Sequence, residues 1–365
     1  MIFREIQSYL EQTAPLAYQE SYDNSGLLVG NPSQEVSGIL VCLDITEAVV
    51  EEAIGLGYNV IIAHHPVIFK GLKSLTGKNY VERVVMKAVK HDILLYAMHT
   101  NLDNIHTGIN RILGEKLGLK NLKILSPKRN LLKKLVTYIP VKNLDTVREA
   151  VFEAGAGVIG NYDQCSFNVT GEGTFRAGDN TNPFTGKKGE FHKEKEVRTE
   201  TVFPSHLERN IVAALLAAHP YEEVAYDIYT LDNEYDKTGA GMTGELEEPV
   251  ALEDFLRSVK QNLGLEVIKY TPLPDKMIQK AAFCGGSGSF LIDAARASGA
   301  DIFLTGDLTY HRFFEHENQM VLADIGHYES EQFAKELIFN LLIQKFPTFA
   351  VRICNTVTNP VSILK

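Results

Sequence analysis

The sequence has few cysteines and no long hydrophobic run, and both absences narrow the classes of protein to which it can belong. Its four cysteines lie far apart and form no CxxC pair: Cys42, Cys165, Cys284 and Cys354. Neither a disulfide framework nor a thiolate zinc site is therefore expected, and a reducing cytosol suits the chain best. No stretch reaches the roughly 18 apolar residues that cross a bilayer. Residues 1–12, MIFREIQSYLEQ, have the pattern of an amphipathic helix rather than a signal peptide, so we expect a cytoplasmic protein without a membrane partner.

Positive charge is also scarce. Lys and Arg number 36 against 46 Asp and Glu, a formal net charge of -10 at pH 7. This balance opposes nonspecific attraction to phosphate backbones and anionic lipid. Nucleic acid is therefore not an expected partner, although a metal ion or a local basic patch could still bind a small anionic ligand such as a nucleotide.

The two outer thirds of the 365 residues alternate apolar strand-like runs with helical patterns, as βαβ units do. Runs that are apolar throughout are typical of parallel strands covered by helices on both faces. We therefore expect an α/β fold, a split domain with mostly parallel sheets flanked by helices. The predicted strands are 38–44, 59–65, 93–99, 277–285, 300–307 and 319–327.

The middle of the chain has a different pattern of apolar and polar residues. Residues 165–204 alternate apolar and polar side chains around Gly, Asn and Pro turns, which is typical of antiparallel strands and loops. We predict a small α+β insert over residues 129–232. Residues 1–128 and 233–365 then form the split α/β domain.

Polar side chains that can bind metals stand where the predicted strands end. His64 and His65 close the run at 59–65, Asp103 follows the run at 93–99, and His327 closes the run at 319–327. Because ligands bind at the carboxyl ends of the strands in open parallel sheets, these side chains are expected to meet in one crevice. Glu331 stands four residues after His327 and would share its helix face.

Imidazole and carboxylate ligands without thiolate suit zinc, iron, manganese or cobalt. A carboxylate such as Asp103 or Glu331 can bridge two ions, and a pair about 3.5–4 Å apart would lower the pKa of a bridging water. Hydrolysis is the chemistry expected from such a pair. A single histidine at a strand end is more often structural, so the prediction of two divalent metal ions depends on the whole set of ligands.

Four further features leave alternatives open. His99 could orient Asp103 or act as an acid or base. Asp307 and His311, four residues apart, could donate protons or contact substrate, and Asp307 could equally cap a helix. The segment CGGSGS, residues 284–289, could bind phosphate at a helix N-terminus or form a tight turn. Asp23 could line the crevice, but a turn-forming role is favoured.

Four motifs, AHHP at 63–66, HTNLD at 99–103, GD at 306–307 and GHYESE at 326–331, resemble the GTP cyclohydrolase I type 2 homologue family, also called NIF-three-like. The resemblance implies a dinuclear divalent metal site whose ligands fall on His64, His65, Asp103, His327 and Glu331. AAHPYEEVAYDI at 217–228 is similar to the hallmark of a subgroup with a CutA/PII-like insert. The resemblance also implies a homohexamer of stacked trimers.

The family name implies conversion of GTP to 7,8-dihydroneopterin triphosphate with release of formate. On this hypothesis one of the candidate catalytic residues, His99 or His311, moves protons. A metal-dependent phosphoesterase or nucleotide hydrolase, which needs the same two ions, is one alternative. A nonenzymatic metal-handling or regulatory protein is the other. In the insert, His219, Glu222 and Glu223 could suggest another metal site, but an interface or structural role is favoured.

Overall fold

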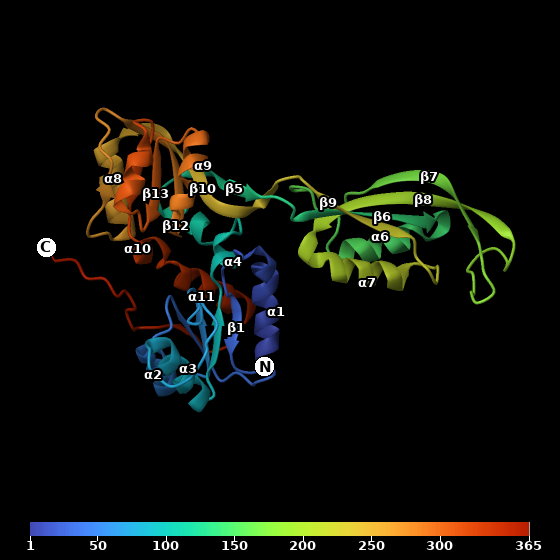
Figure 1. Cartoon of the computed structure of the whole chain (residues 1–365), viewed down its shortest axis with the longest axis horizontal. Coiled ribbons are helices and arrows are strands. Elements are labelled where there is room, and N and C mark those ends of the chain that lie inside the picture. Colours follow the sequence, from blue (N-terminus) through green and yellow to red (C-terminus); the bar gives the residue numbers. More distant parts are fainter. Residues whose placement is uncertain (365) are drawn as a thin grey trace. The chain divides into compact units, whose positions relative to one another are not determined.

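The computed structural model describes residues 1–364, which form two compact units. One unit combines Met1–Pro127 with the chain from Asp236 onward, and the other is Lys128–Tyr235. Figure 1 labels many of the helices and strands of both units. Every helix in the described part of the chain is too short or too polar to cross a membrane.

The first sheet of the split unit has five strands in the order β1-β4-β3-β2-β15. The last four are parallel, and β1 pairs with β4 in the antiparallel sense. Every residue of β2, β3 and β4 is buried, which explains why these runs are apolar throughout. The bounds are β1 (Gly26–Val29), β2 (Ile39–Cys42), β3 (Val60–Ala63), β4 (Leu94–Ala97) and β15 (Val351–Ile353).

Helices cover both faces of this sheet. On one face, α2 (Glu47–Leu56) and α3 (Tyr80–Lys90) share a hydrophobic core with β2, β3 and β4. On the other face, Phe3 of α1 (Phe3–Thr13) packs its ring 5.6 Å from that of Tyr96. Another helix, α11 (Ala334–Lys345), contacts β2 and β15.

The second sheet of the split unit has six strands in the order β11-β14-β13-β12-β10-β5. The three strands β12, β13 and β14 are parallel, while β10 runs antiparallel to β12 and β11 runs antiparallel to β14. The bounds are β5 (Lys120–Lys128), β10 (Tyr235–Ala251), β11 (Lys269–Tyr270), β12 (Met277–Ser287), β13 (Ile302–Gly306) and β14 (Val321–Asp324).

Alternate residues of β12 belong to two cores, because successive strand side chains point to opposite faces. Ala281 and Phe283 pack with α8 (Leu252–Leu263), and Ala282 and Cys284 pack with α9 (Ile292–Ala297). The remaining short elements of this unit are α4 (Thr100–Asp103), α5 (Ile109–Lys116), α10 (His327–Glu331), η1 (Leu16–Tyr18), η4 (Ser289–Leu291) and η5 (Tyr310–His316).

The other unit has an α+β fold of two layers, a β-sheet and a pair of helices. Its sheet has the order β7-β8-β6-β9 and is antiparallel throughout. Two helices cover one face of the sheet and share its core (Figure 1). The bounds are β6 (Leu132–Pro140), η2 (Val141–Asn143), α6 (Leu144–Glu153), β7 (Phe167–Arg176), β8 (Phe191–Pro204), η3 (Ser205–Leu207), α7 (Glu208–Ala218) and β9 (Tyr226–Leu231).

The α/β fold with several sheets flanked by helices is the one that the sequence predicts. Five of the six predicted strands contain a shorter observed strand, and the sixth, 277–285, lies within β12, which extends to Ser287. The outer thirds of the chain build two separate sheets in the split unit. Likeness of the insert to CutA or PII proteins stays a prediction.

Candidate metal centre

The split unit gathers all five predicted ligands at the ends of its strands. His64 and His65 follow β3, and Asp103 closes the short helix α4 that follows β4. His327 opens α10 just after β14, and Glu331 closes that helix. The convergence arises because parallel strands present their carboxyl ends at one edge of each sheet.

Glu331 lies at the middle of this cluster and is 3% exposed. Its Oε2 is 3.0 Å from Nε2 of both His65 and His327, and its Oε1 is 3.7 Å from Nε2 of His64. Burial opposes ionisation of Glu331, but the three imidazoles outweigh it and hold the pKa of this carboxyl well below its usual range. Glu331 is therefore a carboxylate whose two oxygens face different histidines.

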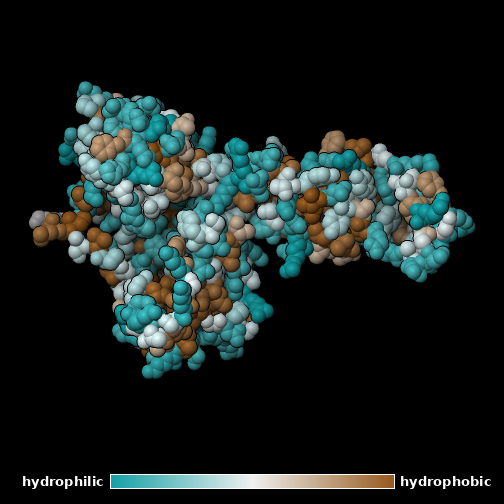
Figure 2. All heavy atoms as spheres, in the orientation of Figure 1, coloured by the Kyte–Doolittle hydropathy of each residue, from teal (hydrophilic) through white to brown (hydrophobic). Residues whose placement is uncertain are grey.

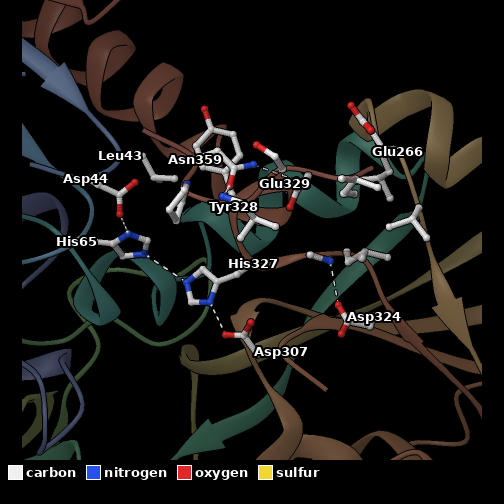
Figure 3. A pocket seen from close by; sticks show the side chains of 18 of the residues that line it. Leu43, Asp44, His65, Glu266, Asp307, Asp324, His327, Tyr328, Glu329 and Asn359 are labelled. Atoms are coloured by element: carbon white, nitrogen blue, oxygen red, sulfur yellow. Dashed lines mark hydrogen bonds and ion pairs between the residues drawn. The ribbon is translucent and has the colours of Figure 1, made fainter. Parts of the chain in front are cut away.

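Each of these histidines has its Nδ1 fixed by an acceptor, which directs Nε2 into the cluster. Nδ1 of His64 lies 2.8 Å from the backbone oxygen of Met98. Nδ1 of His65 lies 2.7 Å from Asp44, and Nδ1 of His327 lies 2.7 Å from Asp307. Figure 3 shows the resulting row Asp44, His65, His327, Asp307. Such partners orient metal-binding imidazoles and raise their basicity.

The electrostatic environment shifts the pKa values of the three histidines in different directions. Burial lowers the pKa of His64 to about 4, so this ring is neutral. Burial also disfavours charge on His65, but Asp44 and Glu331 outweigh it and raise the pKa to about 10. Glu331 raises the pKa of His327 to about 9 against burial, with help from Asp307. The carboxylates beside His65 and His327 thus favour a positive charge at these two rings.

Two buried polar atoms of the cluster have no hydrogen-bond partner. Nε2 of His64 and Oδ1 of Asp103 lie 3.7 Å apart, and each is inaccessible to solvent. Burial and the negative charge of Glu331 raise the pKa of Asp103 well above its usual range. Buried polar atoms normally find a partner, so this pair calls for an explanation.

His99 stands beside the cluster and is held by Asp23. Its Nδ1 lies 2.7 Å from Oδ1 of Asp23, and its ring centroid is 5.2 Å from that of His64 and 5.4 Å from that of His65. Burial opposes ionisation of Asp23, but His99 and Thr100 outweigh it and lower its pKa. Asp23 is therefore more than the turn former that the sequence favours, and His99 contacts Asp23 rather than Asp103 through Nδ1.

Two cavities meet at the cluster. The larger cleft, about 970 Å³, is lined by His65, His99, His327 and Asp307 together with residues 359–364 (Figure 3). The smaller, about 180 Å³, is lined by His99, His327 and the carboxylates Asp103 and Glu331. His311 lines neither: it lies in η5 against Tyr310 and Phe314.

The glycine-rich segment at 284–289 makes room for α10. A Cβ on Gly286 would lie 2.2 Å from Oε1 of Glu331, and this glycine has φ of 59°. The backbone N–H of Gly286 donates to Ser330, and that of Gly288 donates to Thr305. These donors are used inside the protein, so the structure favours close packing of a tight turn over phosphate binding.

Three important side chains were not assigned these roles from sequence. Asp44 closes the predicted strand 38–44 just as the histidines close theirs, and this signal could have identified it. Asp307 holds His327 and is not seen as a helix cap. The sequence around Asp23 has only the pattern of a turn, which does not indicate a contact with His99.

The profile of the Duf34/NIF3 (NGG1p interacting factor 3) family matches residues 1–360. The chain belongs to the Duf34/NIF3 family. This NIF3 chain is 38% identical over 369 residues to a Bacillus subtilis (strain 168) protein, covering 99% of this chain and 98% of the relative. A Halalkalibacterium halodurans protein is 40% identical over 302 residues, covering 82% and 81%. Both relatives are named GTP cyclohydrolase 1 type 2 homolog.

Solved structures agree with this family membership. A Bacillus cereus protein related to NIF3 superposes with a TM-score of 0.87 at 36% identity, over 100% of this chain and 99% of that one. A Staphylococcus aureus protein has a TM-score of 0.79 at 30% identity, with the same coverage. The family predicted from sequence is confirmed. The homohexamer and the cytoplasmic location stay predictions for this NIF3 chain.

Proposed function

We propose that this chain is a hydrolase that holds two divalent metal ions with His64, His65, Asp103, His327 and Glu331. The observation that carries the proposal is the sharing of Glu331 between two groups of donors. One group is His64, Asp103 and Glu331, and the other is His65, His327 and Glu331. The donor atoms of each group lie within 4.8 Å of one another. A carboxylate shared in this way is suited to bridge two ions.

The residues present fit metal ions. A cation between Nε2 of His64 and Oδ1 of Asp103 would satisfy two buried atoms that have no hydrogen-bond partner. Nitrogen and oxygen donors without thiolate are suited to zinc, iron, manganese or cobalt. A third group, His64, His65 and His99, also brings its donor atoms within 4.8 Å, which makes His99 an additional candidate ligand.

When bound, a pair of such ions activates water and stabilises negative charge on oxygen. The chain's own residues supply orientation and proton transfer. Asp44 and Asp307 hold the rings of His65 and His327 at their Nδ1 atoms. His99 lines both cavities, and with Nδ1 on Asp23 its Nε2 is available to exchange a proton with a bound substrate.

GTP is the first candidate substrate, because the relatives are named GTP cyclohydrolase 1 type 2 homolog. Its conversion to 7,8-dihydroneopterin triphosphate and formate begins with hydrolytic opening of the purine. The cleft of about 970 Å³ is large enough for a nucleotide.

The charge of the larger cleft favours a second candidate. Apart from histidines, the charged residues that line it within residues 1–364 are one cation, Lys269, and five carboxylates: Asp44, Glu266, Asp307, Asp324 and Glu329. Besides the two proposed ions, a triphosphate would therefore meet one ammonium group and several negative charges of these side chains. A phosphoester with fewer negative charges is better suited to this lining, and its hydrolysis needs the same two ions.

The deciding experiment measures metal content and turnover together. We would reconstitute the full chain with each of the four metals, then count ions by elemental analysis and assay formate and phosphate from GTP and from p-nitrophenyl phosphate. Glu331→Gln should lose ions and turnover, whereas His91→Ala, an exposed histidine at the end of α3, should match the wild type.

Formate release identifies a cyclohydrolase, and phosphate alone identifies a phosphoesterase. Bound ions with neither product would contradict a hydrolase and favour a metal-handling protein. A wild-type chain that binds no ion after reconstitution would remove the basis of the proposal.

A further inference from the structure

The chain beyond β15 is tied to the split unit by hydrogen bonds to carboxylates. The backbone N–H of Cys354 donates to the oxygen of Val41, so the segment continues alongside β2. Glu52 of α2 then accepts the backbone N–H groups of Asn355 and Thr356 at 2.7 and 3.0 Å, and the Thr356 hydroxyl at 2.6 Å. These bonds, against burial, lower the pKa of Glu52. The segment is therefore fixed in place before it reaches the metal centre.

Two residues later the segment contacts the carboxylate that orients a predicted metal ligand. The Thr358 hydroxyl donates to Oδ2 of Asp44 at 2.7 Å. The other oxygen of Asp44 lies 2.7 Å from Nδ1 of His65, whose Nε2 is 3.0 Å from Glu331. Because both oxygens of Asp44 have partners, the carboxylate has little freedom to rotate away from His65.

We propose that Thr358 is a positioning residue for the metal centre, which acts by fixing the Asp44 carboxylate that orients His65. The proposal rests on the proposed function only in requiring that His65 binds metal. It makes the C-terminal segment a part of the metal centre, although Thr358 is 314 residues from Asp44 in the sequence.

The same segment continues into the larger cleft. Asn359 donates to Oε1 of Glu329 at 3.2 Å, and its own Oδ1 accepts the N–H of Val361. Residues 359–364 line one side of the cleft. Hydrophobic residues predominate at the projecting end of this segment (Figure 2), where Val361 and Leu364 are exposed. The anchor at Thr358 therefore also fixes the start of an apolar wall beside the metal centre.

Thr356 provides a matched control within the segment. Like Thr358, it donates a hydroxyl hydrogen bond to a carboxylate, but its partner Glu52 accepts hydrogen bonds from Asn355 and Thr356 of the segment and orients none of the predicted metal ligands. A general effect of loosening the segment should follow loss of either hydroxyl. An effect transmitted through Asp44 should follow loss of Thr358 alone.

The test compares Thr358→Val, Thr358→Ser and Thr356→Val in the full chain. Zinc affinity would be measured by competition with a chromophoric chelator, and ligand geometry by the visible absorption of the cobalt-loaded protein. Direct partners of metal-binding histidines alter affinity by about 10–100-fold, so one step further away Thr358→Val should weaken zinc by about 3–10-fold and shift the cobalt spectrum. Thr358→Ser keeps the hydroxyl and should match the wild type, as should Thr356→Val.

Thermal unfolding of all three variants would show that each is folded. Equal losses in Thr356→Val and Thr358→Val would overturn the proposal in favour of simple anchoring, and so would wild-type affinity and spectrum in Thr358→Val. Because the readout is metal binding, a chain that binds two ions but hydrolyses nothing would contradict the proposed function and leave this test intact.

Discussion

Glu331 and His327 stand at opposite ends of the five-residue helix α10, with Oε2 of the glutamate 3.0 Å from Nε2 of the histidine. The i,i+4 spacing puts both side chains on one helix face. The length of the glutamate side chain then lets its other oxygen face His64 at 3.7 Å. A bridging role of Glu331 would therefore depend on the length of its side chain as well as on its charge.

Shortening this side chain should remove one of the two proposed ions. Glu331→Asp keeps the negative charge but is one methylene shorter, so its oxygens cannot face both donor groups. We expect about one tightly bound ion per chain instead of the two that a bridging carboxylate supports. Elemental analysis after dialysis would measure this, with Glu336→Asp, at an exposed glutamate of α11, as the control. Two ions in Glu331→Asp would contradict a bridging role.

Removing charge from the partners of the histidines should weaken metal binding without unfolding the protein. Asp44→Asn and Asp307→Asn each replace the carboxylate at Nδ1 of a predicted ligand. We expect zinc affinity to fall by about 10–100-fold in each. Asp293→Asn, on the exposed surface of α9, should leave affinity unchanged. Wild-type affinity in both test variants would show that these aspartates do not act on the ions.

One variant can distinguish whether His99 is a metal ligand or a proton-transfer group. If it moves a proton, His99→Gln should lower kcat by about 100-fold or more while the ion count stays at that of the wild type. One limb of the pH profile of kcat should disappear as well. Loss of an ion from His99→Gln would instead identify a sixth ligand, in keeping with its closeness to His64 and His65.

The approach of Gly286 to Glu331 predicts a steric effect on the metal centre. Gly286→Ala places a Cβ 2.2 Å from Oε1 of Glu331, so the carboxylate must move and ion binding should be lost. Gly264→Ala is a close control, because Gly264 has φ of 67° with nothing within 4 Å of an added Cβ. That variant should lose only stability: its free energy of unfolding should fall by the roughly 1–2 kcal/mol that the left-handed conformation costs a residue with a side chain. Equal thermal shifts and normal metal content in both variants would refute the steric argument.

The sequence by itself determined the class of fold and the five side chains of the candidate metal centre. Strands that are buried on both faces must be apolar throughout, so the runs that end in His65 and His327 reveal both their burial and the edge at which they stop. A histidine at that edge departs from the apolar pattern. Local chemistry of this kind can be recognised without coordinates.

Only the tertiary structure decided how these side chains are held. Asp23 reaches His99 across 76 residues, Asp44 reaches His65 across 21, and Thr358 reaches Asp44 across 314. Each is a common loop residue whose local sequence suits a turn or a strand end equally well. Their roles arise from strand order, since β15 lies beside β2, and β2 lies beside β3. That order brings distant loops to one edge of a sheet, and it is set by the packing of the whole unit rather than by any segment alone.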